Sequence, residues 1–375
     1  MTRVLVLNAG SSSLKASVIE SGRHDPLATT QVDWGSDATQ VVDRRTTVER
    51  ALEELWRAGI EPLSLRGAGH RVVHGGTRFT EPTLIDDEVL SQLDGLAELA
   101  PLHNPIAVET IRAQRELLPG LSAVAVFDTA FHAQLPDEAF VYPLPWKWYL
   151  EWGIRRFGFH GLSVVWALGR SAELLGRPAR DLGLVVAHLG SGCSVTAVDG
   201  ERSVSTSMGL TPLEGLAMGT RAGSVDPGIL VHVLRRRGLT ADDLAETLDH
   251  RSGLLGLSGI SGDVREVRAA ARNGSDRARL ALDVFARRAA EGIAAAATAL
   301  SRLDALVFTG GIGEHDGLMR ADICARLAVL GVAPLDPEQS PAHDVIVSPA
   351  GSGVAVLRVE AREDLVIARA VLERA

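Results

Sequence analysis

Short apolar runs alternate with amphipathic stretches along the whole chain, and this alternation predicts an α/β fold. Buried strands are expected at 3–7, 14–19, 124–127 and 305–308. A Thr46-x-x-Glu49 capping box predicts the start of one helix, and Asn104-Pro105 predicts the start of another that reaches about Leu118. The periodic stretch 282–300 predicts a long helix directly before the last of these strands.

The first strand runs into a turn of small residues, Asn8-Ala9-Gly10-Ser11-Ser12-Ser13, which is followed by Lys15. Backbone N–H groups, hydroxyls and a cation around one point predict an anion site, and glycine allows a phosphate to come close. Residues 184–198 repeat this layout, with Gly190 in the place of Gly10. The repeat indicates two related domains that face each other across a cleft, although two unrelated Gly/Ser turns would give the same pattern.

A third glycine turn, residues 309–314, reads Thr-Gly-Gly-Ile-Gly-Glu and follows the strand at 305–308. A helix is expected after it, at 319–330. Strand, glycine turn and helix in this order are typical of nucleotide sites, because the turn and the helix N-terminus present N–H groups to phosphates. Three such turns in one chain favour a phosphate-binding function.

Composition narrows the class of protein. The chain has 375 residues and a net charge of −9 without a basic block, which argues against nucleic-acid binding and makes two domains the natural expectation. Its 2 cysteines lack the spacing of metal ligands or of a disulfide framework. No apolar run is long enough for a signal peptide or a membrane span, so a cytoplasmic protein without a membrane partner is expected.

Ten short sequence motifs, spread over nearly the whole chain, resemble those of the acetate kinase family in the family's order. They lie at 8–15, 69–76, 100–105, 127–132, 157–161, 188–190, 211–215, 218–221, 309–314 and 362–364. The resemblance places the chain in the superfamily of actin, heat-shock proteins and sugar kinases. It implies two duplicated actin-like (ribonuclease H-like) domains: 1–132 with 365–375, and a nucleotide-binding domain at 133–364.

The resemblance also implies a phosphotransferase with a carboxyl group as acceptor. Such an enzyme moves the γ-phosphoryl group of ATP directly and in line to acetate, giving acetyl phosphate and ADP, and the reaction is reversible. It needs Mg²⁺, which Mn²⁺ can replace, and it works as a homodimer.

Catalytic roles are carried over from the family to Arg71, Asp128, His160 and Arg221. The planar guanidinium suits carboxylate and phosphate, so Arg71 and Arg221 are expected to neutralise charge on the transferred group. Acetic acid, with a pKa of roughly 4 to 5, is already ionised at neutral pH. Asp128 is therefore expected to position groups and to bind the metal ion with Asn8 and Glu363, not to act as a general base.

The remaining roles follow from the same resemblance. Acetate is expected to contact Arg71, Val73, Leu102, His103, Phe159 and Pro212. The nucleotide is expected to contact Ser11, Ser13, Lys15, His188, Gly190, Ser191, Gly192, Asp263, Val264, Arg265, Gly310, Gly311, Ile312, Gly313 and His315. Without the resemblance these positions are ordinary, because apolar side chains are usually core, histidines structural and arginines exposed.

Two positions depart from the family pattern, since Ser191 and His315 each stand where the family usually has asparagine. Serine is shorter and lacks the amide, so a phosphate contact is lost or passes through water. Three alternative functions stay open: a propionate or butyrate kinase, a sugar or polyol kinase with Asp128 as general base, and a non-catalytic ATP-dependent clamp.

Overall fold

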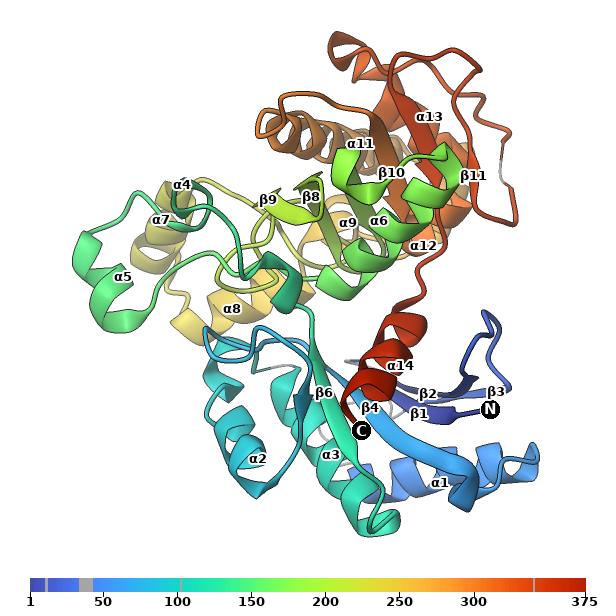
Figure 1. The fold of residues 1–375 in the computed structure, drawn as a ribbon. Coiled ribbons are helices and arrows are strands. Elements are labelled where there is room, and N and C mark those ends of the chain that lie inside the picture. Colours follow the sequence, from blue (N-terminus) through green and yellow to red (C-terminus); the bar gives the residue numbers. More distant parts are fainter. Residues whose placement is uncertain (11–12, 34–42, 102, 340) are drawn as a thin grey trace. The chain divides into compact units, whose positions relative to one another are not determined.

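The computed structural model describes residues 1–10, 13–33, 43–101, 103–339 and 341–375 (Figure 1). The chain forms two compact units: unit 1 is Met1–Ala133 with Arg362–Ala375, and unit 2 is Gln134–Ala361. Each unit is built around one six-stranded mixed sheet. No helix of the described residues is long and apolar enough to cross a bilayer.

The sheet of unit 1 has the strand order β3-β2-β1-β4-β6-β5. Its strands are β1 (Arg3–Ala9), β2 (Ser13–Glu20), β3 (Ala28–Asp33), β4 (Leu65–Val72), β5 (Thr83–Leu84) and β6 (Ala123–Phe127). Strands β1, β4 and β6 run parallel, whereas β1, β2 and β3 form an antiparallel meander in which Asn8 pairs with Lys15. The carboxyl ends of β1, β4 and β6 therefore share one edge of the sheet.

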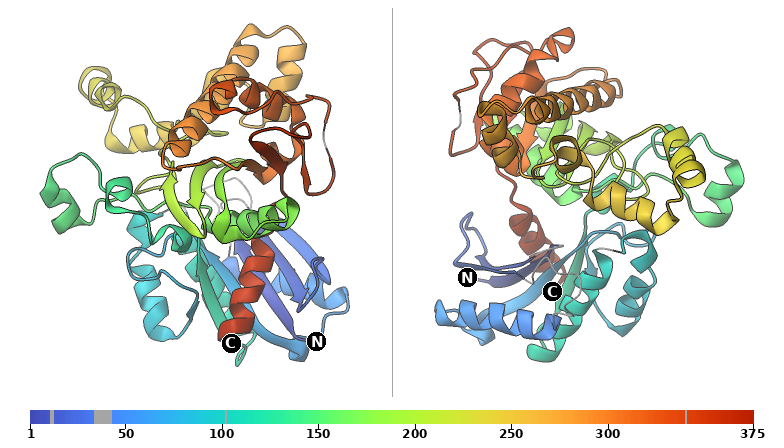
Figure 2. Two further views of the ribbon diagram at one scale, coloured as in Figure 1. Left: turned by 45° about the horizontal axis from the view of Figure 1, so that its top comes forward. Right: turned by 180° about the vertical axis from the view of Figure 1, so that it is seen from behind.

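Helices cover both faces of this sheet (Figures 1 and 2). They are α1 (Arg44–Arg57), α2 (Asp87–Asp94), α3 (Asn104–Leu117) and α14 (Glu363–Arg374). The apolar side of α1 packs with Leu5, Leu7 and Leu14 in one core cluster, while α14 lies on the opposite face. The contact between β4 and α14 is so close that a Cβ atom on Gly69 would stand 2.3 Å from Ile367 of α14. Glycine in β4 thus sets the depth at which α14, and Glu363 at its start, can lie.

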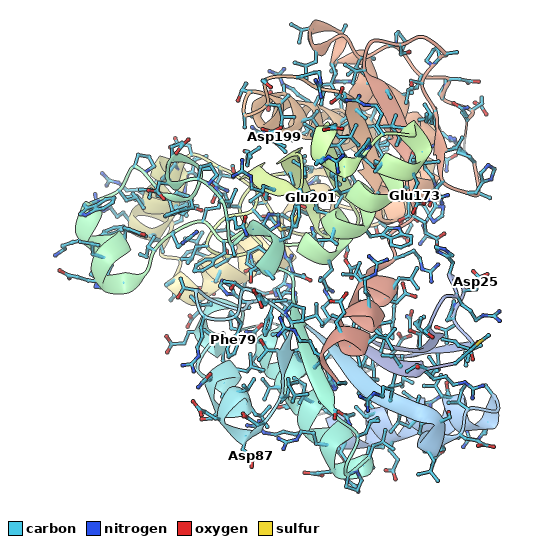
Figure 3. All side chains as sticks on the ribbon, in the orientation of Figure 1. Asp25, Phe79, Asp87, Glu173, Asp199 and Glu201 are labelled. Carbon is cyan, nitrogen blue, oxygen red and sulfur yellow. The ribbon has the colours of Figure 1, made fainter. Side chains whose placement is uncertain are left out.

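Aromatic packing closes the core near the carboxyl end of β6. The rings of Phe79 and Phe127 stack with their centroids 5.2 Å apart, and Phe79 is labelled in Figure 3. Both side chains belong to a cluster of apolar residues from β6, α2 and α3. This packing fixes the strand end that Asp128 follows.

Unit 2 repeats the topology of unit 1 with the strand order β11-β12-β10-β7-β8-β9. Its strands are β7 (Gly183–Leu189), β8 (Cys193–Asp199), β9 (Arg202–Thr206), β10 (Ala305–Thr309), β11 (Val345–Ile346) and β12 (Ala355–Arg358). Again three strands form an antiparallel meander, and its first strand pairs in parallel with β10, which pairs in parallel with β12. The two sheets match strand for strand, which confirms the predicted α/β fold with duplicated domains.

The helices of unit 2 are α4 (Asp137–Phe140), α5 (Trp146–Trp152), α6 (Gly161–Leu175), α7 (Pro227–Arg237), α8 (Ala241–His250), α9 (Gly253–Ser258), α10 (Val264–Arg272), α11 (Asp276–Ala297), α12 (Gly310–His315) and α13 (Gly317–Ala325). Helix α6 packs on β7 and β10, and α11 packs on β7 and β8. Helices α5, α7 and α8 form an extension of this unit away from its sheet, and α4 links the extension to β9 (Figures 1 and 2).

Several predicted helix boundaries are wrong, and each has a local cause. Asp43, not Thr46, caps α1, because its carboxylate accepts the N–H of Arg45 and also takes the Thr46 hydroxyl at 2.7 Å. Helix α3 has His103 as its N-cap, so Asn104 is its first residue. Helix α11 begins six residues earlier than 282, at Asp276, behind the cap Ser275. A helix starts at Gly310 itself, and a second one, α13, ends at Ala325, well before 330.

Candidate active site

In unit 1, charged and amide side chains meet at the carboxyl edge of β1, β4 and β6. Arg71 donates from Nε to Asp128 Oδ1 at 2.9 Å and from Nη2 to Oδ2 at 2.5 Å, a two-point contact. Its Nη1 donates to Asn8 Oδ1 at 3.3 Å. Asn8 Nδ2 in turn donates to Glu363 Oε2 at 3.3 Å, and this oxygen lies 3.7 Å from Arg71 Nε. Asn8, Arg71, Asp128 and Glu363, which are far apart in sequence, therefore form one cluster.

Burial controls the charges of this cluster. Burial alone would lower the pKa of Arg71, but the charges of Asp128 and Glu363 outweigh it and hold that pKa above its usual value. Burial also raises the pKa of Glu363, and the nearby charge of Asp128 adds to the effect, while Arg71, Asn8 and Lys15 oppose it. The Asp128 side chain is only 1% exposed, so its charge depends on Arg71 for compensation.

The loop after β4 is held by buried polar groups. Asn104 is fully buried; its Oδ1 accepts the N–H of His74 at 3.0 Å and its Nδ2 donates to the His74 carbonyl at 2.9 Å. Thr129 Oγ1 accepts the N–H of Gly75 at 3.0 Å. These bonds fix the segment that links Arg71, through Val73, to the next turn, so the loop has little freedom to move the arginine.

In unit 2, the turn between β7 and β8 is closed by a hydrogen bond from the Gly190 N–H to the Gly192 carbonyl at 3.0 Å. The Ser191 carbonyl accepts the N–H of Gly219 at 3.1 Å, so the turn is tied to the segment that carries Arg221. A Cβ atom on Gly192 would stand 3.6 Å from Arg221 Nη1. The arginine therefore lies directly beside the glycine turn.

The Arg221 segment is held by the N-terminus of α9. The carbonyls of Met218 and Gly219 accept the N–H groups of Leu254 and Leu255 at 2.9 Å each. Gly253 adopts a positive φ of 59°, and a Cβ atom there would stand 2.2 Å from the Met218 carbonyl oxygen. Asp249 lies 3.7 Å from Arg221 Nε, and burial lowers the pKa of this arginine although Asp249 opposes the shift.

Two histidines lie at the same end of this sheet. His188 is near the end of β7, and His160, the N-cap of α6, is the one described residue other than glycine with a positive φ, at 60°. A left-handed conformation of this kind costs roughly 1–2 kcal/mol and is common at functional sites. The two rings stack with centroids 4.1 Å apart.

The turn after β10 is supported from inside the unit. Arg320 is fully buried, and its Nη1 donates to the carbonyls of Gly313 at 2.8 Å and Glu314 at 2.9 Å. Thr309 Oγ1 is buried and has no hydrogen-bond partner among the described residues. An unpaired buried hydroxyl costs about 1–3 kcal/mol, which makes this group a candidate contact for a bound phosphate or water.

Comparison with known proteins identifies the family. The model of the acetokinase family matches residues 3–369. The chain is 43% identical over 395 residues to an acetate kinase of Geobacillus kaustophilus, with 100% of both chains covered. It is 46% identical over 394 residues to an acetate kinase of Leifsonia xyli subsp. xyli, with 100% of this chain and 99% of the other covered.

The chain belongs to the acetokinase family. Solved structures agree. The crystal structure of Porphyromonas gingivalis acetate kinase matches with a TM-score of 0.90 at 33% identity, covering 100% of this chain and 99% of the other. A propionate kinase from Francisella tularensis subsp. tularensis matches with a TM-score of 0.89 at 34% identity, covering 99% of each chain. The resemblance stated from sequence motifs is confirmed.

The predicted site residues of this acetokinase divide between the two units. Unit 1 contains Asn8, Ser13, Lys15, Arg71, Val73, His103, Asp128 and Glu363, and unit 2 contains the remaining described ones. Ser11 and Leu102 lie outside the described residues. The predicted acetate pocket draws on both units, with Val73 and His103 in one and Phe159 and Pro212 in the other. Its assembly stays a prediction.

The later residues of unit 2 that are predicted to bind the nucleotide differ from one another in burial and in contacts. Asp263 caps α10 through the N–H of Arg265 and pairs with its guanidinium, whose side chain is 87% exposed. Val264 is buried, so it belongs to the core of the unit. The His315 side chain is exposed at the end of α12, with Nε2 3.8 Å from Glu314. These positions keep their predicted roles as hypotheses.

Three residues that support this site were not singled out by the sequence, and Asn104 was singled out only as the start of a helix. Asn104 and Arg320 hold the turns, and Ser163 and Ser194 contact the two histidines through hydroxyl groups. Counting from a hairpin that turns at 190–192 pairs Ser194 with His188, but its contact with His160 needs the folded chain. Ser163 and Arg320 also depend on contacts that leave no local signal.

Proposed function

We propose that this acetokinase transfers the γ-phosphoryl group of ATP to acetate, giving acetyl phosphate and ADP, and that the reaction is reversible. In the forward direction a carboxylate oxygen forms the new bond to phosphorus. The bond from phosphorus to the β,γ-bridging oxygen breaks, and this oxygen leaves on ADP. No proton has to move, since acetate is ionised at neutral pH, with a pKa of roughly 4 to 5 for the acid.

The observation that carries this proposal is the two-point contact between Arg71 and Asp128. Both carboxylate oxygens of Asp128 accept hydrogen bonds from the guanidinium, so this carboxylate holds Arg71 in place. A sugar or polyol kinase needs an aspartate that acts as general base on a hydroxyl group, whereas a carboxylate acceptor needs none. The arrangement of Asp128 therefore favours acyl phosphate formation over sugar phosphorylation.

Unit 2 has the chemistry of a phosphate site. The backbone turns at 190–192 and 310–313 and the Arg221 guanidinium gather at one end of its sheet. Such groups stabilise the charge that spreads over the oxygens of a transferring phosphoryl group. Arg71 of unit 1 is the second arginine to which the family resemblance gives a role in the transfer.

A divalent cation fits the cluster of unit 1. Among the described residues no three His, Cys, Asp or Glu side chains gather as a metal site, but Asp128, Glu363 and Asn8 meet around Arg71, and their oxygens would hold the ion beside that guanidinium. Mg²⁺ prefers oxygen ligands of this kind and keeps several waters. Burial raises the pKa of Glu363, so this carboxylate would gain from a cation. When bound, Mg²⁺ would neutralise phosphate charge, and Mn²⁺ can substitute for it.

The test is to trap the product with hydroxylamine. The purified full chain is incubated with ATP, MgCl₂ and hydroxylamine, together with acetate, propionate, butyrate, glucose or glycerol in separate reactions. We expect a hydroxamate from acetate, and a kcat/KM for propionate that is about 10- to 200-fold lower, which is the discrimination that one methylene allows. Arg71→Ala is the control that should give no hydroxamate above background.

Each other outcome supports an alternative. A higher kcat/KM for propionate or butyrate than for acetate would make the chain a kinase for the longer acid, as the Francisella relative is named. A phosphorylated sugar or polyol without hydroxamate would move Asp128 into the role of general base. Binding of ATP without phosphoryl transfer to any acceptor would support the third alternative, a non-catalytic ATP-dependent clamp.

We infer that the protein forms a homodimer through the extension of unit 2. Helix α5 exposes Trp146, Leu150 and Trp152, and α7 exposes Ile229 and Val231, at 46–66% of their surface. Exposed groups of large apolar residues mark interaction surfaces, and aromatic residues are enriched in protein interfaces. A second copy of the chain would remove these groups from water.

Analytical ultracentrifugation tests the dimer. We expect about twice the chain mass of 39.8 kDa for the wild type, and a shift to one chain mass for Trp146→Glu combined with Ile229→Glu. Leu63→Glu is a matched control, because Leu63 is also exposed but lies in unit 1. A wild-type monomer at micromolar concentration would contradict this inference without affecting the reaction.

A further inference from the structure

Each of the two histidines of unit 2 is held on one ring nitrogen by a buried serine. His160 Nδ1 lies 2.9 Å from Ser194 Oγ, and His188 Nδ1 lies 2.8 Å from Ser163 Oγ. Both serines are completely buried, Ser163 in the first turn of α6 and Ser194 on β8. These two matching contacts lie beside the turns that are proposed to bind phosphates, so they bear on the function of the site.

The opposite ring edge faces the glycine turns. A Cβ atom on Gly192 would stand 3.5 Å from His160 Nε2, and one on Gly310 would stand 3.1 Å from His188 Nε2. The absence of side chains at these glycines leaves the Nε2 atoms next to the backbone that is proposed to bind phosphates. Nδ1 of each ring thus faces a buried serine, and Nε2 lies beside a glycine turn.

We propose that Ser163 and Ser194 are positioning residues that hold both imidazoles as Nε2–H tautomers, so that two N–H donors face the phosphates. This rests on the proposed function for its ligand. A neutral imidazole carries one N–H, and its position is set by the hydrogen bond that the other nitrogen makes. A serine hydroxyl that donates to Nδ1 leaves the proton on Nε2.

The charges of the site favour this arrangement over its alternatives. Two imidazolium rings 4.1 Å apart, next to Arg221, would repel each other and the arginine. If instead Nδ1 carried the proton and serine accepted it, the Nε2 lone pairs would face phosphate oxygens and repel them. Only the neutral Nε2–H form gives two donors without adding charge.

The backbone of His160 adds an independent observation. Its left-handed conformation, φ 60°, follows Gly158, which also has a positive φ of 79°. A bulky residue in this conformation is held there by its surroundings. Here the contact with Ser194 and the stacking on His188 account for that restraint. The left-handed conformation of His160 therefore helps to direct the Nε2 edge of its ring toward the glycine turn.

The test is nitrogen NMR on the full chain with ¹⁵N-labelled histidine. The chain has 11 histidines, and the signals of His160 and His188 are assigned by comparison with the spectra of His160→Gln and His188→Gln. We expect Nε2 to carry the proton in both rings of the wild type. In Ser194→Ala and Ser163→Ala the ring that loses its serine should populate the other tautomer, and kcat should fall about five- to tenfold, as expected for one lost hydrogen bond.

Matched controls exist for both serines. Ser171 is a buried serine of α6 that donates to the Ala167 carbonyl, and Thr196 is a buried residue of β8 that bonds to Thr206. Ser171→Ala and Thr196→Val should leave both tautomers unchanged and keep kcat within twofold. Ser163→Thr and Ser194→Thr, unlike the alanine variants, keep a hydroxyl group and should keep the Nε2–H signal.

The NMR result separates this proposal from the proposed reaction, because it needs no turnover. Nδ1–H tautomers in the wild type, or unchanged tautomers in both alanine variants, would overturn the positioning role even if acetyl phosphate forms. Failure to form any acyl phosphate would overturn the reaction, while Nε2–H tautomers that depend on the serines would still support the positioning role.

Discussion

The two units carry one proposed catalytic arginine each, and the surroundings of these arginines are different. Arg71 makes a two-point contact with Asp128 and lies close to Glu363 and Asn8. Arg221 has Asp249 at 3.7 Å and lies beside a glycine turn. In unit 1 the positive charge is already balanced by carboxylates. In unit 2 the surroundings of the arginine include a backbone turn and a longer contact with Asp249.

This difference indicates a division of work between two copies of one fold. Asp128 and Glu363 lie beside one arginine in unit 1, and we propose that these carboxylates also hold the divalent cation. In unit 2 an arginine, two histidines and backbone N–H groups are proposed to bind anions. We therefore propose that the same strand order supports metal binding in one unit and phosphate binding in the other.

The largest effects are expected from removing the arginines. Arg71→Ala and Arg221→Ala should each lower kcat by about 10³- to 10⁵-fold, the range for an arginine that stabilises phosphoryl transfer, while the fold survives. Steady-state assays of acetyl phosphate formation measure this. Wild-type activity in either variant would remove the proposed role of that arginine.

Stability measurements on the same two variants sharpen the comparison. Arg71→Ala leaves the buried Asp128 without its partner, and breaking such a pair costs about 3–5 kcal/mol. Arg221→Ala removes a weaker contact and should cost much less. Urea unfolding followed by circular dichroism should therefore rank Arg71→Ala as the less stable variant. Equal losses would mean that the two arginines are held in the same way.

The carboxylates give the next largest contrast. Asp128→Asn keeps the shape but removes the charge that holds Arg71, so kcat should fall by about 10²-fold or more. Asp249→Asn acts on an ion pair of 3.7 Å with a quarter of the Asp249 side chain exposed, which is a longer contact than the one between Arg71 and Asp128. Its kcat should fall less than about fivefold. A large effect of Asp249→Asn in the same assay would show that Arg221 depends on this carboxylate.

The third contrast is in sensitivity to acid, and it concerns His70 in β4 of unit 1. Burial lowers the pKa of His70 to about 4, although its hydrogen bond with Gln114 opposes the shift. An unfolded chain has a histidine pKa near 6.5, so the unfolded state binds more protons between these values. The stability that neutral His70 provides is complete above about pH 6.5 and is lost as pH falls toward 4, by about 3 kcal/mol in total.

Urea unfolding at several pH values measures this loss. His70→Gln should reduce the dependence of the free energy of unfolding on pH in this window. His250→Gln, at an exposed position on α8 of unit 2, is the matched control and should leave the dependence unchanged. A wild-type stability that does not change between pH 6.5 and 4 would contradict the buried, neutral state of His70.

Much of this arrangement could be predicted from the sequence, and the reason is local. Apolar runs that end in Gly and Ser predict both hairpins, and the register of β1 and β2 places Lys15 opposite Asn8. The motifs at 69–76 and 127–132 then identify Arg71 and Asp128 as site residues. Their meeting at the carboxyl edge of the sheet follows from parallel strands.

What could not be predicted depends on contacts between distant segments. Nothing near Asp249 in the sequence indicates that it lies beside Arg221, because α8 reaches that loop only in the folded chain. The start of α1 was misplaced because two caps competed within four residues, and the Asp43 carboxylate accepts both an N–H and the Thr46 hydroxyl. Local patterns fix the strands and turns. Side-chain partners and helix ends depend on contacts that form only in the folded chain.

The smallest expected effect concerns the departure of unit 2 from the family at Ser191. Its side chain is exposed and its carbonyl accepts the Gly219 N–H, so a longer side chain meets no obstacle in the turn. Ser191→Asn restores the amide that the family usually has and should add one hydrogen bond to a phosphate. A net gain of about 0.5–1.5 kcal/mol lowers the dissociation constant for ATP roughly two- to tenfold.

Isothermal titration with ATP measures this gain, and Ser301→Asn, at an exposed serine of the same unit, is the matched control. Because Ser191 belongs to the unit that is proposed to bind phosphates, the affinity for ATP should change while the KM for acetate stays constant. A change in the KM for acetate with unaltered ATP affinity would assign the turn at 190–192 to the acceptor. The proposed division of work between the two units would then have to be abandoned.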